Sequence, residues 1–159
     1  MAVQPASTEI ATRTASIIHE FRALEGPLLP ILNGVQHEFG YVPQEALLVI
    51  ADELNISRAE VHGVASFYHD YRKEPAGRHV LKVCQAEACQ SMGSDATTAR
   101  IKQLLGIDFH QTAKDGSVTL EPVYCLGLCA CSPSAMLDGE VIGRLDNEKI
   151  DEIVEAVRS

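Results

Sequence analysis

The stretch "YCLGLCACSP" (124–133) places three cysteines within seven residues, in the pattern C-x3-C-x-C. The stretch "VCQAEACQS" (83–91) carries the other two cysteines of the chain, in the pattern C-x4-C. Each stretch begins at the end of a short apolar segment typical of a β-strand, "HVLKVC" (79–84) or "SVTLEPVYC" (117–125). Such strand ends can lie side by side at one edge of a sheet, so the two loops can converge on one metal centre.

Three interpretations of these cysteines compete. They could hold a [2Fe–2S] cluster through four thiolates, form a structural zinc site with four cysteine ligands, or be ordinary buried or redox-active thiols. Two close pairs at matched strand ends argue against ordinary thiols, and the wide C-x4-C favours a two-iron core over zinc, which prefers C-x2-C. A Rieske site needs two histidine ligands, and neither histidine of this half, His79 or His110, stands beside a cysteine.

The rest of the second half predicts an α/β fold. Residues 94–106 read as a helix capped by Ser94, residues 134–143 as a hairpin turning at Asp138-Gly139, and residues 146–159 as a closing helix. The resulting order is β-α-β-β-β-α, an α/β sandwich of thioredoxin-like size. The apolar face of the closing helix consists of Ile150, Ile153, Val154 and Val157.

The first half predicts a small bundle of four helices. A helix over 8–24 is followed by helices that Pro27 and Pro43 open, and the capping box Ser57-Arg-Ala-Glu60 starts a fourth. The residues expected to face inward are Ile10, Ile17, Ile18, Phe21 and Leu24, then Leu28, Leu32, Val35 and Phe39, then Leu47, Leu48, Ala51 and Leu54, and finally Val61, Val64, Ala65 and Tyr68.

The polar segment "RKEPAG" (72–77) reads as a linker between the two halves. We therefore expect two domains, a helical bundle over 1–75 and a metal-binding α/β domain over 76–159. Neither half contains G-x-G-x-x-G or a P-loop, so the sequence has no nucleotide-binding motif. The cysteine loops could hold a group that stores an electron.

The composition argues against several classes of protein. Thirteen basic against 22 acidic residues give a net charge of −9, which argues against nucleic-acid binding. The longest apolar run, "ALLVIA" (46–51), is far shorter than the ~20 residues of a spanning helix. The N-terminus has no apolar signal core, so we expect a cytoplasmic protein without membrane insertion. An odd cysteine count in a reducing compartment argues against disulfides.

The combined motifs resemble a known family. C-x4-C followed by C-x3-C, behind the helical segments "ILNGVQHEFGYVPQEAL" (31–47) and "LNISRAEVHGVASFYHDYR" (54–72), is similar to the 24-kDa-type [2Fe–2S] subunits of respiratory complex I. NAD-reducing hydrogenases and NAD-dependent formate dehydrogenases have matching subunits. The details "CQAEACQSMG" (84–93) and "EPVYCLGLCACSP" (121–133) look most like the gamma subunits of molybdenum-containing formate dehydrogenases.

The resemblance implies a thioredoxin-like [2Fe–2S] ferredoxin domain with one cluster. Its four ligands map onto Cys84, Cys89, Cys125 and Cys129, which leaves Cys131 as a spare. It also implies a subunit that is not catalytic by itself. FMN and NAD would be bound by a neighbouring subunit, and further Fe–S clusters and the molybdenum cofactor by a large one. The alternative from another functional class is a binding module whose fold is held together by a structural zinc ion.

The resemblance carries one more expectation. Thioredoxin-like folds usually have a proline, often cis, just before the third strand, and Pro133 stands at that place. We therefore expect a cis Ser132–Pro133 bond, although only ~5–6% of X–Pro bonds are cis.

Overall fold

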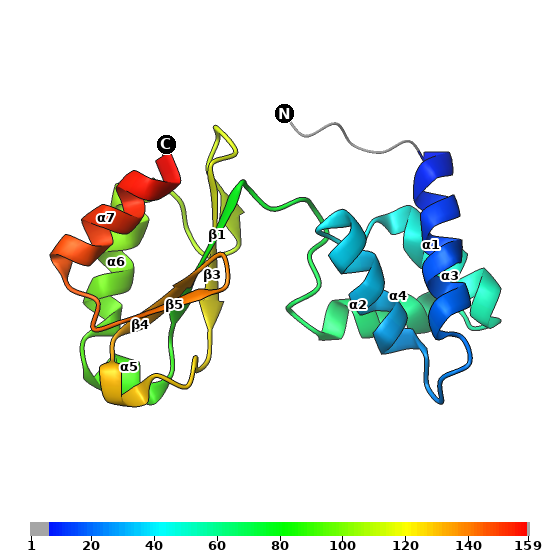
Figure 1. Ribbon diagram of the computed structural model, residues 1–159, viewed down its shortest axis with the longest axis horizontal. Coiled ribbons are helices and arrows are strands. Elements are labelled where there is room, and N and C mark those ends of the chain that lie inside the picture. Colours follow the sequence, from blue (N-terminus) through cyan, green and yellow to red (C-terminus); the bar gives the residue numbers. More distant parts are fainter. Residues whose placement is uncertain (1–6, 159) are drawn as a thin grey trace. The chain divides into compact units, whose positions relative to one another are not determined.

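The computed structural model of the chain describes residues 7–158, which form two compact units that divide after Pro75 (Figure 1). Each unit is built around its own cluster of buried apolar side chains. Within residues 7–158, no helix is long and apolar enough to cross a membrane.

The first unit contains four helices, joined by short connections. Their bounds are Ser7–Phe21 (α1), Leu28–Phe39 (α2), Gln44–Leu54 (α3) and Arg58–Phe67 (α4). Gly40 ends α2 and Asn55 ends α3, both with left-handed backbone. The expected capping box starts α4: the Glu60 N–H donates to Ser57 Oγ at 3.1 Å, and the Ser57 N–H donates to the Glu60 carboxylate at 2.8 Å.

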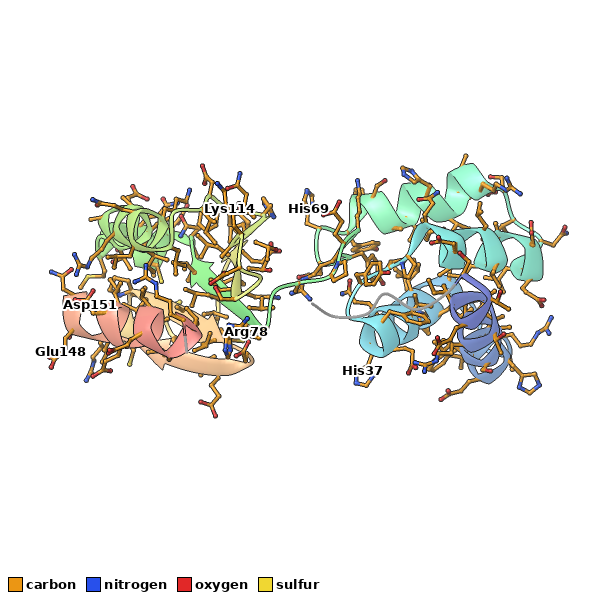
Figure 2. The ribbon with its side chains drawn as sticks, turned by 90° about the horizontal axis from the view of Figure 1, so that it is seen from above. His37, His69, Arg78, Lys114, Glu148 and Asp151 are labelled. Carbon is orange, nitrogen blue, oxygen red and sulfur yellow. The ribbon has the colours of Figure 1, made fainter. Side chains whose placement is uncertain are left out.

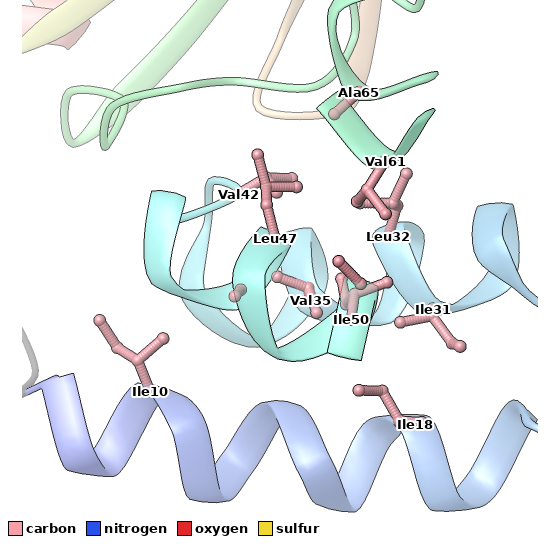
Figure 3. Packing of buried hydrophobic residues seen from close by; sticks show 12 residues of the cluster. Ile10, Ile18, Ile31, Leu32, Val35, Val42, Leu47, Ile50, Val61 and Ala65 are labelled. Carbon is pink, nitrogen blue, oxygen red and sulfur yellow. The ribbon is translucent and has the colours of Figure 1, made fainter. Parts of the chain in front are cut away.

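The core of this unit is aliphatic (Figure 3). Its buried members come from all four helices and from the turn before α3: Ile10, Ile18, Ile31, Leu32, Val35, Val42, Ala46, Leu47, Ile50, Ala51, Val61 and Ala65. Three expected core residues do not belong to it. Leu48 is only half-buried because the inward stripe of α3 runs through Ala46 and Ile50 instead. Leu24 and Tyr68 lie beyond the ends of their helices and are exposed.

The second unit contains a five-stranded sheet in the order β2-β3-β1-β4-β5. Strands β1 and β3 are parallel, and the other neighbouring pairs are antiparallel. The bounds are His79–Cys84 (β1), Glu87–Ser91 (α5), Ser94–Leu105 (α6), Gln111–Thr112 (β2), Val118–Val123 (β3), Cys129–Cys131 (η1, a 3₁₀ turn), Ser134–Leu137 (β4), Glu140–Gly143 (β5) and Asn147–Arg158 (α7).

Helices α6 and α7 pack against the sheet (Figure 1). All four residues expected on the inner face of α7 are buried. The two helices are also joined at the surface, where Arg100 Nη2 donates to both carboxylate oxygens of Asp151, at 2.6 and 2.9 Å (Asp151 is labelled in Figure 2).

Three details of this unit differ from the sequence expectation. Ser94 is the first residue of α6 rather than its cap, because Gly93 takes the capping position with left-handed backbone. Helix α5 and strand β2 were not expected. Each is too short, at five and two residues, for an apolar period to show.

The hairpin β4–β5 turns as expected, with positive φ at both Asp138 (50°) and Gly139 (95°). The Asp138 carboxylate accepts the Val80 N–H at 2.7 Å and lies 2.7 Å from His79 Nδ1, so the turn is tied to β1. The Ser132–Pro133 peptide bond is cis, which confirms that expectation.

Candidate metal centre

The two cysteine loops leave the same end of two neighbouring parallel strands. Cys84, the last residue of β1, stands beside Val123, the last residue of β3. The Gln85 N–H continues the ladder by donating to the Val123 carbonyl at 2.7 Å. Cys125 therefore follows two residues after the partner of Cys84. The expected placement of the two strand ends side by side at one edge of the sheet is confirmed.

The first cysteine pair is buried. Cys84 and Cys89 are each 2% exposed. Helix α5 begins three residues after Cys84 and contains Cys89. The Cys89 sulfur lies next to Ser132 and Ser134, in the segment that leads into β4. This pair is thus shielded from water by the domain itself.

The second pair is exposed, and its geometry suits one metal ion. The Sγ atoms of Cys125 and Cys129 are 3.9 Å apart. A tetrahedral metal with bonds of about 2.3 Å to sulfur places two sulfurs about 3.8 Å apart. This spacing suits iron and zinc alike.

The loop between these cysteines is shaped to hold their sulfurs. Cys125 has φ of 109°, a backbone conformation that non-glycine residues adopt at a cost of about 1–3 kcal/mol and that concentrates at functional sites. Gly127, also with positive φ, turns the chain so that its N–H donates to Cys125 Sγ at 3.4 Å. This turn brings the backbone close to the Cys125 sulfur.

The pKa of the Cys129 thiol responds to the other cysteines of the two loops. The pKa of the Cys129 thiol is raised, first by its hydrogen bond and charge interaction with Cys125, and further by slight desolvation and by the charges of Cys89 and Cys84. Thiols repel one another's ionised forms in this way only when they are close. The four cysteines expected as ligands lie at the same end of the sheet, as one buried pair and one exposed pair.

Cys131 occupies a different position. It ends the 3₁₀ turn η1, and its Cβ lies against β5, so close that a Cβ added to Gly143 would stand 2.8 Å from it. The Arg144 N–H also donates to the Cys131 carbonyl at 2.6 Å. Cys131 is thus packed on the hairpin.

Two serines near the centre were not anticipated. Ser132 Oγ and Ser134 Oγ lie 3.6 and 3.5 Å from Cys89 Sγ. Burial alone would raise the pKa of the Cys89 thiol, but hydrogen bonding with Ser134, Ser132 and Cys84 outweighs that effect and lowers it. The sequence signal was the pair of hydroxyls in "CSPS" (131–134), directly after the cysteine loop.

The two histidines of this unit have other partners. His79 pairs with Asp138, and His110 Nδ1 lies 3.0 Å from the Glu121 carboxylate. Among residues 7–158, no three side chains of Cys, His, Asp or Glu are already grouped around a single metal position. The sulfurs come instead as two pairs, and a [2Fe–2S] core takes two protein ligands on each iron.

Comparison with protein families decides between the metals. The model of the thioredoxin-like [2Fe–2S] ferredoxin family matches residues 14–158, nearly the whole chain. The chain belongs to the thioredoxin-like [2Fe–2S] ferredoxin family. Its cofactor is accordingly one [2Fe–2S] cluster, and the donor set of four converging thiolates fits that group.

Curated relatives agree with this family. The E subunit of NADH-quinone oxidoreductase from Pseudomonas aeruginosa is 36% identical over 148 residues, which cover 91% of this chain and 89% of the relative. The E subunit of the same enzyme from Mycobacterium tuberculosis H37Rv is 37% identical over 143 residues. That match covers 90% of this chain but only 57% of the longer mycobacterial protein.

A solved structure shares the fold. The NAD+-reducing [NiFe]-hydrogenase, in its air-oxidised crystal structure, superposes with a TM-score of 0.70 over 82% of this chain and 22% of that chain. Sequence identity there is 23%. The likeness bears on the fold, a helical region followed by a thioredoxin-like ferredoxin.

Proposed function

We propose that this chain is the electron-transfer subunit of a cytoplasmic NAD-dependent oxidoreductase. It holds its cluster through Cys84, Cys89, Cys125 and Cys129. The observation that supports the proposal is that a buried and an exposed cysteine pair follow the neighbouring ends of the parallel strands β1 and β3. A [2Fe–2S] cluster gains and returns a single electron, so bound there it makes the chain a one-electron relay.

In this proposal the two cysteine pairs have different roles in binding the cluster. The buried pair anchors one side of the centre within the domain, and the exposed pair leaves the other side open to a redox partner. Tyr124 and Met92 stand beside the two cysteine loops and are 76% and 63% exposed. Apolar side chains exposed around a redox centre suit a surface that docks on another protein.

The partner in this proposal is a subunit that binds FMN and NAD. The chain has no dinucleotide fingerprint, so hydride chemistry must take place on another subunit. In isolation the chain neither oxidises NADH nor reduces NAD.

We assign the whole enzyme as an NAD-dependent formate dehydrogenase, whose large subunit carries further Fe–S clusters and the molybdenum cofactor. The support is the likeness of the loops at 84–93 and 121–133 to the gamma subunits of such enzymes. The second candidate is the equivalent subunit of NADH:quinone oxidoreductase, favoured by the 36% identity to the E subunit from Pseudomonas aeruginosa. The corresponding subunit of an NAD-reducing hydrogenase has the same fold.

The test has two stages. The purified chain should be reddish brown and contain two irons and two sulfides, as expected for one [2Fe–2S] cluster; a colourless protein with bound zinc would refute the electron-transfer role. The complex purified from its native host is then reduced, and its electron paramagnetic resonance spectrum is recorded. A [2Fe–2S] signal that appears with formate supports the formate assignment. A signal with NADH only, in a complex that lacks molybdenum and purifies with membrane subunits, supports the quinone reductase relative.

A further inference from the structure

The four cysteine sulfurs do not have the same neighbours, and Cys89 differs in being close to two buried hydroxyl groups. Its Sγ is buried and lies within 3.6 Å of two serine hydroxyls, which are themselves 9% (Ser132) and 1% (Ser134) exposed. The exposed sulfur of Cys125 receives a backbone N–H, from Gly127. Hydroxyl donors in a buried setting act on a neighbouring charge with little screening by water.

The two hydroxyls do not have the same freedom to donate. Ser132 Oγ donates its single proton to the Cys129 carbonyl, at 2.8 Å, so toward the Cys89 sulfur it can only accept. Ser134 Oγ makes no other hydrogen bond within the described residues, and its proton is available to Cys89. A metal-bound cysteine is a thiolate and can only accept. Ser134 is therefore the hydroxyl that donates to the sulfur of a bound Cys89.

We propose that Ser134 is a positioning residue for the cluster. Its hydroxyl donates to Cys89 Sγ and raises the reduction potential of the centre, and Ser132 ties the second ligand loop to the same spot through the Cys129 carbonyl. The inference rests on the ligand set given under the proposed function. Reduction adds one negative charge, which spreads onto the ligand sulfurs. A donor to sulfur thus stabilises the reduced form more than the oxidised form.

The experiment measures the midpoint potential of the cluster in the full chain, after reconstitution with iron and sulfide. Dithionite supplies one electron per cluster, no bond is made or broken, and the reduced fraction is followed by electron paramagnetic resonance. Ser134→Ala removes the hydroxyl. Ser94→Ala is the matched control, because Ser94 is also fully buried in this unit and its hydroxyl has no partner in the part of the chain described.

We expect Ser134→Ala to lower the midpoint potential and Ser94→Ala to leave it unchanged. Resonance Raman bands of the Fe–S(Cys) stretches should lose part of their shift in D₂O in Ser134→Ala only. Equal potentials and equal D₂O shifts in Ser134→Ala and the wild type would overturn the proposal.

A second pair of variants covers the case in which Ser134→Ala does not keep its cluster. Ser134→Thr and Ser134→Val add nearly the same volume and differ in the hydroxyl. The proposal is supported if Ser134→Thr keeps the cluster while Ser134→Val loses it or has a lower midpoint potential. Equal cluster content and equal midpoint potential in the two variants would overturn it. If the wild-type chain itself takes up no [2Fe–2S] cluster, the proposed function fails instead.

Discussion

Cys84 and Val123 are partners in the parallel ladder between β1 and β3, and this register determines where the metal centre lies. Because both strands run the same way, the loops that follow them start at the same edge of the sheet. The C-x4-C and C-x3-C loops, 41 residues apart between their first cysteines (125 − 84), thereby reach one place.

The ligand set is testable by serine scanning. Replacing Cys84, Cys89, Cys125 or Cys129 singly by Ser should abolish or strongly reduce the visible absorption and bound iron, since thiolates hold both irons. Cys131→Ser should keep both, because Cys131 is packed against Gly143 on the hairpin. The assignment is wrong if Cys131→Ser loses the cluster while Cys129→Ser retains it.

Gly127→Ala should destabilise the second unit by about 1 kcal/mol, because a side chain is strained at φ of 78° although the space around it is open. Urea unfolding of the iron-free chain, followed by circular dichroism, measures this change. The control is Gly63→Ala in the middle of α4, also in open space but with ordinary helical backbone. That change should stabilise the first unit by about 1 kcal/mol. Equal effects of the two substitutions would contradict the role of backbone strain at Gly127.

Stability in acid should depend on Asp138. Burial alone would raise the pKa of this carboxyl, but hydrogen bonds from His79 and the Val80 N–H outweigh it and hold the pKa below its usual value. A lowered folded-state pKa contributes stability that is present above the unfolded value of about 4 and is lost as pH falls through the folded value.

We therefore expect Asp138→Asn to remove this contribution while tolerating the positive φ of the turn. In the iron-free chain, the stability difference between wild type and Asp138→Asn should be constant above about pH 5 and shrink as the pH falls below about 4. A difference that stays constant below about pH 4 would show that the carboxylate charge does not contribute to stability.

The helical unit should serve for docking. The second unit has its own buried core and carries all five cysteines, so a chain that starts at Pro75 should still bind the cluster. The same truncated chain should fail to join the flavin subunit in a pull-down assay that captures the full chain. An insoluble product without iron would show instead that the first unit is needed to complete the second.

Much of this protein could be read from local sequence. The capping box at Ser57, the Asp138-Gly139 turn and the buried face of α7 are confirmed because each depends on residues within a few positions of one another. The same holds for the two cysteine loops at strand ends. Where the local pattern was short, as in α5 and β2, or ran past a helix end, as at Leu24 and Tyr68, the expectation was absent or wrong.

The sequence by itself determined the number of sulfurs, their pairing in two loops and the elements that carry them. Only the tertiary structure decided that Cys89 is buried and meets Ser132 and Ser134, which are 43 and 45 residues away along the chain. The physical reason is the strand order. Strand β4 pairs antiparallel with β1, so the segment that enters β4 lies at the edge where β1 ends. Such pairing depends on packing the whole sheet against α6 and α7, which no short window of sequence contains.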